Sequence, residues 1–329
     1  NTGTHLVGQK AFHSGQRSIA DIPLTDLCGE GVIVDISDAV SDYSLYSPDM
    51  ITDRVEVKRG DILLINTGYH KYGWDQPDVY NTRAQGGIEN KEFGFYLRHP
   101  GPDPDFLQWA VDMKLRLVGV DSGCAEHPMN TNLRYMHARE FEKAEAKTLA
   151  KYGKSWDEMF PQDWYHELTH ITLPKSGLLL AESLGGQINE LSNQRAWIMV
   201  QPIPFMEVES AWARVVALQA PEDIDMDKFF SAMHSAEMLD MTLPFSVQTP
   251  QWANYIPLSI NYTKRVGGQY FGLGRNNAHC RASFHLATHM DGEKHFHMGG
   301  RSIGETPLDY WIGQGAVADI SDKVTNSSV

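Results

Sequence analysis

The chain contains one segment twice. Residues 1–45 and 285–329 align without a gap at an offset of 284, and 20 of the 45 aligned positions are identical. The run Arg17-Ser18-Ile19, for example, returns as Arg301-Ser302-Ile303. Two stretches this similar encode the same local fold, and one domain cannot place both in the same strands. Three arrangements are therefore compatible with the repeat: a tandem arrangement, a circular permutation, or an exchange of segments between chains.

The two copies differ at four positions that matter for chemistry. The later copy has ligand-type side chains at all four: His285, His289, Asp291 and His295. The earlier copy keeps one histidine there, with Asn1, His5, Val7 and Ala11. These positions share one parity, so an extended segment points them to the same face. Imidazole nitrogens and carboxylate oxygens hold Zn²⁺, Mn²⁺ or Fe²⁺. The later copy therefore predicts a metal site.

A second pair of groups is a candidate to complete that site. His170 precedes Glu182 by twelve residues, and the apolar run 178–181 delivers Glu182 to the end of a buried strand. A carboxylate in that position needs a partner such as a metal. A catalytic metal site takes about three protein ligands and leaves one position open for water. One of the histidines is then available as an acid or base.

Strand and helix patterns are mixed along the chain. One apolar face at helical spacing predicts a helix over 105–114, and a stretch rich in Glu, Lys and Ala predicts another over 137–152. Apolar, β-branched runs predict strands at 32–36, 62–65, 115–120, 196–200, 213–218 and 316–320. Many strands with few helices predict a mixed α/β domain rather than a helical bundle.

Charge and cysteine content restrict the partners and the compartment. The formal net charge is −14, whereas nucleic acids and anionic membranes are bound by clustered Lys and Arg. A small-molecule substrate is the expected partner instead. Cys28, Cys124 and Cys280 are widely spaced and form no CxxC, which favours a reducing compartment. The first residues lack the basic and apolar regions of a signal peptide, so the expectation leans towards the cytoplasm.

The later copy resembles the signature of a known enzyme family. Its run His285-Leu-Ala-Thr-His289-Met-Asp291-Gly-Glu-Lys-His295-Phe is similar to HxGTHxDxPxHF, which marks the cyclase family of kynurenine formamidases and isatin hydrolases. Two positions depart from it, with Ala287 in place of Gly and Glu293 in place of Pro. Residues 239–252, 60–68, 118–121 and 213–218 are similar to other parts of the family. The resemblance covers nearly the whole chain.

The resemblance implies a fold and a reaction. The fold would be a β-barrel-like core flanked by helices, of the swivelling β/β/α type, usually in a homo-oligomer. The reaction would be hydrolysis of an amide or lactone in a small, often aromatic or cyclic substrate, with Zn²⁺ or Mn²⁺. Metals supply this chemistry by lowering the pKa of bound water and polarising a carbonyl.

The resemblance also implies a role for each candidate residue. By it, His285, His289 and Asp291 bind the first metal. His170 and Glu182 help to hold a second metal or contact the reacting water, which makes Glu182 a catalytic candidate as well as a ligand. His295 is the acid/base candidate. Aromatic residues expected near the substrate are Tyr69, His70, Tyr72, Trp74, Phe245 and Trp252.

The order of the segments departs from the family. Residues 239–329 correspond to its beginning and 46–218 to its continuation, which predicts a first part at 1–224, a linker at 225–238 and a second part at 239–329. Val7 and Ala11 favour a rival hypothesis, a catalytically inactive repeat module. A third alternative is a cupin-like metal oxygenase, which requires a further histidine on a later strand, and none is obvious.

Overall fold

The computed structural model describes residues 3–13, 15–73, 94–161, 167–251, 255–265 and 275–322. The chain forms two compact units, Asn1–Ala287 and Thr288–Val329. Their boundary lies inside the later copy of the repeat, after His285 and before His289. The sequence predicted a linker at 225–238, and the structure has helix α10, Met226–Ser235, in that range.

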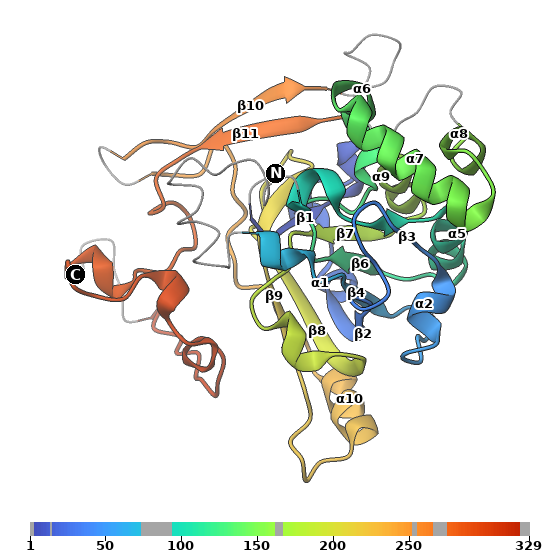
Figure 1. Ribbon diagram of the computed structural model, residues 1–329. Coiled ribbons are helices and arrows are strands. Elements are labelled where there is room, and N and C mark those ends of the chain that lie inside the picture. The colour runs from blue at the N-terminus through green and yellow to red at the C-terminus, as the bar shows by residue number, and fades with distance from the viewer. Residues whose placement is uncertain are drawn as a thin grey trace. The chain divides into compact units, whose positions relative to one another are not determined.

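Strands of the first unit close into a barrel, which confirms the expected barrel-like core in a mixed α/β fold (Figure 1). The order around the barrel is β1-β7-β6-β4-β2-β8-β9, and β1 pairs with β9 to close it. Neighbours among β2, β4, β6 and β7 run parallel, whereas β1 and β8 are antiparallel to both of their neighbours. The strands are β1 His5–Val7, β2 Cys28–Asp35, β4 Ile62–Asn66, β6 Leu117–Val120, β7 Leu179–Glu182, β8 Gln194–Pro202 and β9 Ser210–Leu218.

The parallel strands are largely apolar because both of their faces are buried, and polar residues occur mainly towards their ends. Every side chain of β4 is buried. Leu63 packs in an outer cluster with the helix residue Phe106, whereas Leu64 packs on the opposite, inner face with Leu6. The Val, Ile and Leu side chains of these strands are therefore divided between an inner and an outer part of the core.

Helices cover the outer face of the parallel strands. Helix α5, Pro104–Asp112, buries Phe106, Leu107 and Ala110. Asp103 caps it, since its carboxylate accepts a hydrogen bond from the Phe106 amide at 2.8 Å. The other α-helices described in the first unit are α1 Leu24–Leu27, α2 Pro48–Thr52, α6 Leu133–Met136, α7 Ala138–Tyr152, α8 Trp156–Met159, α9 Leu168–Lys175 and α10.

Most of the predicted elements are confirmed. The helices predicted at 105–114 and 137–152 are α5 and α7. The strands predicted at 32–36, 62–65, 115–120, 196–200 and 213–218 overlap β2, β4, β6, β8 and β9. The strand predicted at 316–320 is wrong, because residues 288–322 contain no strand. A strand needs a partner to be stable, and the sequence pattern carries no information on whether a partner is free.

A hairpin from late in the chain packs on the barrel. Strands β10, Ser259–Lys264, and β11, Asn277–Arg281, pair antiparallel. The Asn276 amide donates to the Ala11 carbonyl at 2.8 Å, and the Ala278 amide donates to the Glu209 carboxylate at 2.8 Å. The hairpin is therefore anchored beside the end of β1. A further two-residue parallel pair joins β3, Leu45–Tyr46, and β5, Gly101–Pro102.

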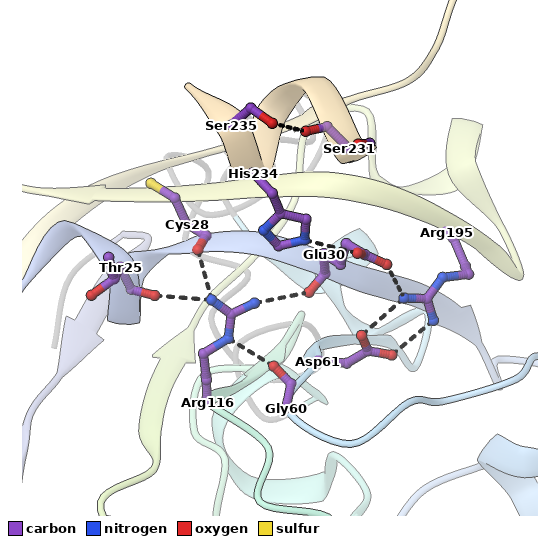
Figure 2. A network of polar contacts seen from close by, with 10 residues as sticks. All are labelled: Thr25, Cys28, Glu30, Gly60, Asp61, Arg116, Arg195, Ser231, His234 and Ser235. Atoms are coloured by element: carbon purple, nitrogen blue, oxygen red, sulfur yellow. Dashed lines mark hydrogen bonds and ion pairs between the residues drawn. The ribbon is translucent and has the colours of Figure 1, made fainter. Parts of the chain in front are cut away.

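Two arginines tie together the N-terminal ends of the parallel strands (Figure 2). Arg195 on β8 holds both carboxylate oxygens of Asp61, at 2.8 and 2.9 Å, and contacts Glu30 at 3.0 Å. Such two-pronged charged contacts are among the stronger hydrogen bonds in proteins. The guanidinium of Arg116 donates to the carbonyl oxygens of Thr25, Cys28, Glu30 and Gly60.

The second unit contains short 3-10 helices. They are η8 Glu293–His295, η9 Ile303–Glu305 and η10 Leu308–Tyr310. In the earlier copy, the aligned elements are η1 Gln9–Ala11, η2 Ile19–Asp21 and α1. Across the described part of the chain, no helix has the length and apolar character needed to cross a membrane.

Candidate active site

The first unit contains a cavity of about 830 Å³ beside β1. Its lining comes from β1, from the loop after β6, from the start of α9, from the segment 205–212 and from hairpin β10–β11. His5, Cys124 and His170 are part of this lining. The cavity therefore brings together polar groups that are far apart in the sequence.

The carboxylate of Glu182 is the centre of the polar groups at this cavity. Glu182 ends β7 and is fully buried. Its Oε1 accepts a hydrogen bond from the Ala125 amide at 2.8 Å and lies 2.8 Å from Nε2 of His170. Its Oε2 lies 3.0 Å from Nε2 of His5, its register partner on β1. That nitrogen makes no hydrogen bond of good geometry with any described residue.

A thiol adds a third kind of donor atom. Sγ of Cys124 lies 3.9 Å from Nε2 of His170. One possible ligand atom from each of Cys124, His170 and Glu182 lies within 4.8 Å of the others. Nitrogen, oxygen and sulfur donors at this spacing are a set that Zn²⁺ accepts, and the sulfur makes the set less suited to Mn²⁺.

Burial and mutual charge control the protonation of these groups. Burial alone would lower the pKa of His170, but Cys124 and Glu182 outweigh it and raise that pKa well above its ordinary value. Burial opposes the charge of Glu182, yet His170 and His5 hold its pKa well below the usual range. Burial and then Glu182 raise the pKa of Cys124 to about 11. Without a cation, His170 and Glu182 form a buried ion pair beside a protonated thiol.

These residues fit a metal ion. The buried carboxylate, the Nε2 atoms of His5 and His170, and the thiol converge from four separate elements. Nδ1 of His170 also has no hydrogen-bond partner among the described residues. Buried charges in proteins are paired or bind metals, so a divalent ion could replace the proton that His170 shares with Glu182.

His99 is a neutral base at the same cavity. It lines the cavity and is fully buried. Its Nδ1 donates to the Pro100 carbonyl at 2.8 Å, so Nε2 carries the lone pair. Burial lowers the pKa of His99 to about 4. Nε2 has no hydrogen-bond partner among the residues that the structure describes, so this nitrogen can accept a proton.

Among the predicted site residues, His170 and Glu182 meet at this cavity, where they are in contact, and the others lie outside its lining. His285 lies in the first unit with its ring 5.4 Å from Tyr255, outside the cavity lining. His289, Asp291 and His295 belong to the second unit. There, Nε2 of His289 lies 3.7 Å from Oδ1 of Asp291.

The earlier copy of the repeat occupies the barrel, and this has a chemical consequence. His5, Val7 and Ala11 all line the cavity. At the aligned positions the later copy carries His289, Asp291 and His295. The cavity therefore presents two apolar side chains where the signature has a carboxylate and a histidine.

Sequence reasoning missed Cys124, His5 and His99 as members of the site. A signal existed for Cys124, which lies in the loop after the buried strand β6, where polar side chains of parallel strands gather. His5 was visible as the surviving histidine of the earlier copy. His99 had no such signal, because only the folded chain shows that its Nε2 is buried beside the cavity.

The aromatic residues expected at the substrate pocket lie elsewhere. Tyr69, His70, Tyr72 and Phe245 are absent from the lining of this cavity, and Trp74 and Trp252 lie outside the described residues. Nδ1 of His70 instead lies 2.9 Å from the buried carboxylate of Asp121. The aromatic side chains that do line the cavity are Phe12, Tyr96, Phe205 and Trp212.

Comparison with known proteins gives one family and several similar structures. The sequence pattern of the Cyclase family matches residues 1–127 and 239–329. A solved structure described as a potential metal-dependent hydrolase with cyclase activity is 19% identical, covers 67% of this chain and 80% of its own, and has a TM-score of 0.44. Isatin hydrolase A from Labrenzia aggregata, bound to benzyl benzoate, is 16% identical, with coverages of 66% and 72% and a TM-score of 0.46. Isatin hydrolase A from Ralstonia solanacearum is 15% identical, with coverages of 66% and 72% and a TM-score of 0.47.

Proposed function

The chain belongs to the Cyclase family, and on this premise we propose that it is a metal-dependent hydrolase that opens an amide or lactone bond in a small aromatic or cyclic substrate. The observation that carries the proposal is the buried carboxylate of Glu182, which faces His170 on one side and His5 on the other. Burying a carboxylate completely beside two imidazoles and a thiol lowers the stability of the fold. Groups in such a setting are therefore candidates for a function.

The ligands that we propose are His5, Cys124, His170 and Glu182, with Zn²⁺ as the ion. The thiol favours Zn²⁺ over Mn²⁺, since Mn²⁺ prefers oxygen donors. A bound Zn²⁺ supplies a nucleophilic hydroxide near neutral pH and polarises a carbonyl oxygen. A two-metal site built on His285, His289 and Asp291 remains the alternative that the signature predicts.

The protein's own residues supply the proton transfer and the substrate's surroundings. His99 is neutral at physiological pH, because burial lowers its pKa to about 4. So weak a base does not hold a proton for long, so its role would be to accept a hydrogen bond from the attacking water at Nε2 and pass the proton on to the leaving nitrogen or oxygen. In the signature this role falls to His295, whose aligned residue at the cavity is Ala11. Phe12, Phe205 and Trp212 provide apolar lining that suits a planar ring and limits the number of competing waters.

Metal content and hydrolysis, measured on the same samples, test this proposal. Wild-type protein should retain about one Zn²⁺ per chain after dialysis, and it should hydrolyse at least one compound in a panel of N-formyl anilines, aromatic lactones and isatin. His170→Ala should lose the metal and the activity together. His234→Ala removes an exposed histidine of α10 that is absent from the cavity lining, so it is the matched control and should keep both. Metal that is kept in His170→Ala would contradict this site.

A second function, a catalytically inactive module, is favoured by Val7 and Ala11. Both line the cavity and are buried among apolar side chains, at places where the signature has Asp and His. A protein that folds fully and takes up neither Zn²⁺ nor Mn²⁺ would establish this alternative. Bound metal without hydrolysis of any amide or lactone in the panel would also exclude the hydrolase.

We further propose that the protein forms a homo-oligomer with a small molecule as its only other partner. The net charge of −14 supports the second part, because it disfavours polyanions. Light scattering at several concentrations measures the first part directly. A mass equal to one 37.0 kDa chain at all concentrations would contradict it.

A further inference from the structure

The two copies of the repeat adopt the same local structure and differ only where partners are needed. The 3-10 helices η1 and η2 recur in the later copy as η8 and η9. The capping box between Ser18 and Asp21 recurs between Ser302 and Glu305. The strands do not recur, since residues 289–291 and 312–319, which align with β1 and β2, are not strands. Local sequence is sufficient for caps and turns, whereas strands require neighbours.

The later copy keeps the apolar pattern of a barrel segment and exposes it. Four core positions of the earlier copy are at most 2% exposed: Leu6, Ile19, Ile33 and Ile36. The aligned side chains are 42% to 86% exposed: Met290, Ile303, Val317 and Ile320. Apolar side chains at these positions have no role on an isolated surface, and large exposed apolar groups mark an interaction site.

Two glycines show which partner the later copy fits. In β2 a Cβ on Gly29 would lie 2.1 Å from the guanidinium of Arg116, and a Cβ on Gly31 would lie 2.1 Å from the Ile62 carbonyl oxygen. The barrel therefore excludes a side chain at Gly31, where the clash is with backbone, and a side chain at Gly29 would displace the Arg116 guanidinium from its hydrogen bonds. The later copy has Gly313 and Gly315 there, although a Cβ on either would meet no atom within 4 Å. Gly313 and Gly315 therefore match what the barrel requires, whereas their own surroundings leave room for a side chain.

The barrel has no vacant place for this segment. Strand β1 pairs with β7 on one side and β9 on the other, and β2 pairs with β4 and β8. A closed barrel has no free edge. The later copy can enter only by replacing the earlier one.

The chain between the barrel and the later copy is long enough for this replacement. Hairpin β10–β11 is anchored beside β1 through Asn276 and Ala278. His289 comes eleven positions after Ala278, and an extended chain of that length spans roughly 36 Å. An intramolecular replacement also avoids the entropy cost of joining two molecules.

We propose that residues 289–319 can replace residues 5–35 in the barrel of the same chain, and that a divalent metal favours the replaced state. The replacement exchanges one apolar segment for another, but it places Ala316 and Ala318 where Val32 and Val34 are fully buried, and Asp291 where Val7 is buried. The metal-free chain therefore favours the earlier copy. The replacement brings His289, Asp291 and His295 to the cavity positions of His5, Val7 and Ala11, beside His170 and Glu182. A ligand that binds one state more tightly shifts the population towards it. The metal preference rests on the proposed function.

Amide hydrogen exchange read by mass spectrometry tests the replacement on the full chain, since residues 28–35 and 312–319 give different peptides. Without metal, the amides of 28–35 should be protected and those of 312–319 should exchange freely. With Zn²⁺, exchange in 312–319 should slow by at least about tenfold while 28–35 loses protection. Bound zinc and molecular mass are measured on the same samples.

Two alanine variants make the test specific. Gly315→Ala leaves the observed state untouched but would drive a Cβ into the Ile62 carbonyl in the replaced state. This variant should show neither the zinc-dependent gain of protection in 312–319 nor the loss in 28–35. Gly304→Ala is the matched control, because Gly304 also has open space around it and aligns with Ala20, where the barrel already accepts a Cβ. It should behave as wild type.

Four outcomes would overturn the proposal. Zinc bound without a change in 312–319 rejects the replacement and leaves the proposed function intact, whereas no zinc binding rejects both. If Gly315→Ala shows the same zinc-dependent change in protection as wild type, the placement of Gly315 at the position of Gly31 is rejected. Protection that appears only in a dimer rejects the same-chain replacement in favour of exchange between two copies.

Discussion

His5 and Glu182 are register partners across β1 and β7, and Nε2 of His5 lies 3.0 Å from Oε2 of Glu182. The earlier copy of the repeat thus contributes its one surviving histidine directly to the candidate metal site. Strand pairing fixes this contact, so the position of His5 depends on which copy occupies the barrel. The same pairing explains why Val7, two residues later on the same face, also reaches the cavity.

Removing the charge of Glu182 should destabilise the metal-free protein. Glu182→Gln keeps an acceptor for the Ala125 amide but leaves His170 without its buried counter-charge. We expect a loss of about 2–4 kcal/mol in the free energy of unfolding, measured by urea denaturation in chelator at pH 7. Glu190→Gln, at an exposed position, is the control and should change stability by less than about 0.5 kcal/mol. Equal stability of the two variants would show that the buried pair is not ionised.

The free energy of unfolding should depend on the shape of the cationic side chain at position 195 as well as on its charge. Lysine cannot reproduce the two-pronged contact with Asp61, so Arg195→Lys should cost about 1–2 kcal/mol. Arg195→Met leaves Asp61 buried without a counter-charge and should cost about 3 kcal/mol or more. The double variant Arg195→Met/Asp61→Leu should recover part of that loss. A urea double-mutant cycle measures the coupling, and additive losses would mean that the pair (Figure 2) contributes nothing.

Asp103 should make stability depend on pH between about 4 and 6. Burial is the main cause that raises the pKa of its carboxyl to about 6, against an ordinary value of 3.8. The folded state therefore binds the proton more tightly, and this contribution to stability is present below pH 4 and lost as the pH rises through 6. Asp103→Asn keeps the helix cap and removes the charge. Relative to wild type it should gain up to about 2 kcal/mol between pH 4 and pH 7, with solvent screening taken into account.

Unfolding in urea at a series of pH values checks this prediction. Asp103→Ala is the companion variant, since it removes the charge and the cap together and should be about 1 kcal/mol less stable than Asp103→Asn at every pH. A difference between wild type and Asp103→Asn that stays constant from pH 4 to pH 7 would contradict the raised pKa.

Truncation after Ala287 should leave the barrel folded. None of the seven barrel strands comes from residues 288–329, so the urea midpoint should stay within the equivalent of about 0.5 kcal/mol of the full chain. The truncated protein should also bind less of a hydrophobic dye, because exposed side chains such as Phe296, Met298 and Val317 are gone. A large drop in the midpoint would mean that the second unit supports the barrel.

The parts of the fold that depend on local pattern were predictable, and those that depend on distant partners were not. Strand β4 was visible because both of its faces are apolar, and α7 because its composition favours a helix. His170 and Glu182 were singled out from the sequence as a candidate pair of ligands, and the structure has them in contact. Cys124 was missed because its place in the site depends on the loop after β6 meeting α9, forty-six residues later.

The repeat shows the same limit most clearly. Residues 316–320 have the composition of a strand, and the aligned residues 32–36 overlap β2, yet only the earlier copy forms one. The two segments differ in part in sequence, since Ala316 and Ala318 stand where β2 has Val32 and Val34. They also differ in whether neighbouring strands are available, and no short stretch of sequence carries that information. The ligand set was likewise assigned to His289 and Asp291 by their residue types, whereas the cavity presents His5 and Val7.

The closed barrel also determines when each copy meets its partners during synthesis. The last barrel strand, β9, ends at Leu218, and His289 follows 71 residues later. At roughly 5–20 residues per second, the ribosome delivers the later copy about 4–14 s after the barrel's final strand. The earlier copy is already present when β9 arrives to close the ring, and it competes with nothing. We therefore expect every newly made chain to begin with the earlier copy in place, whatever the equilibrium between the two copies.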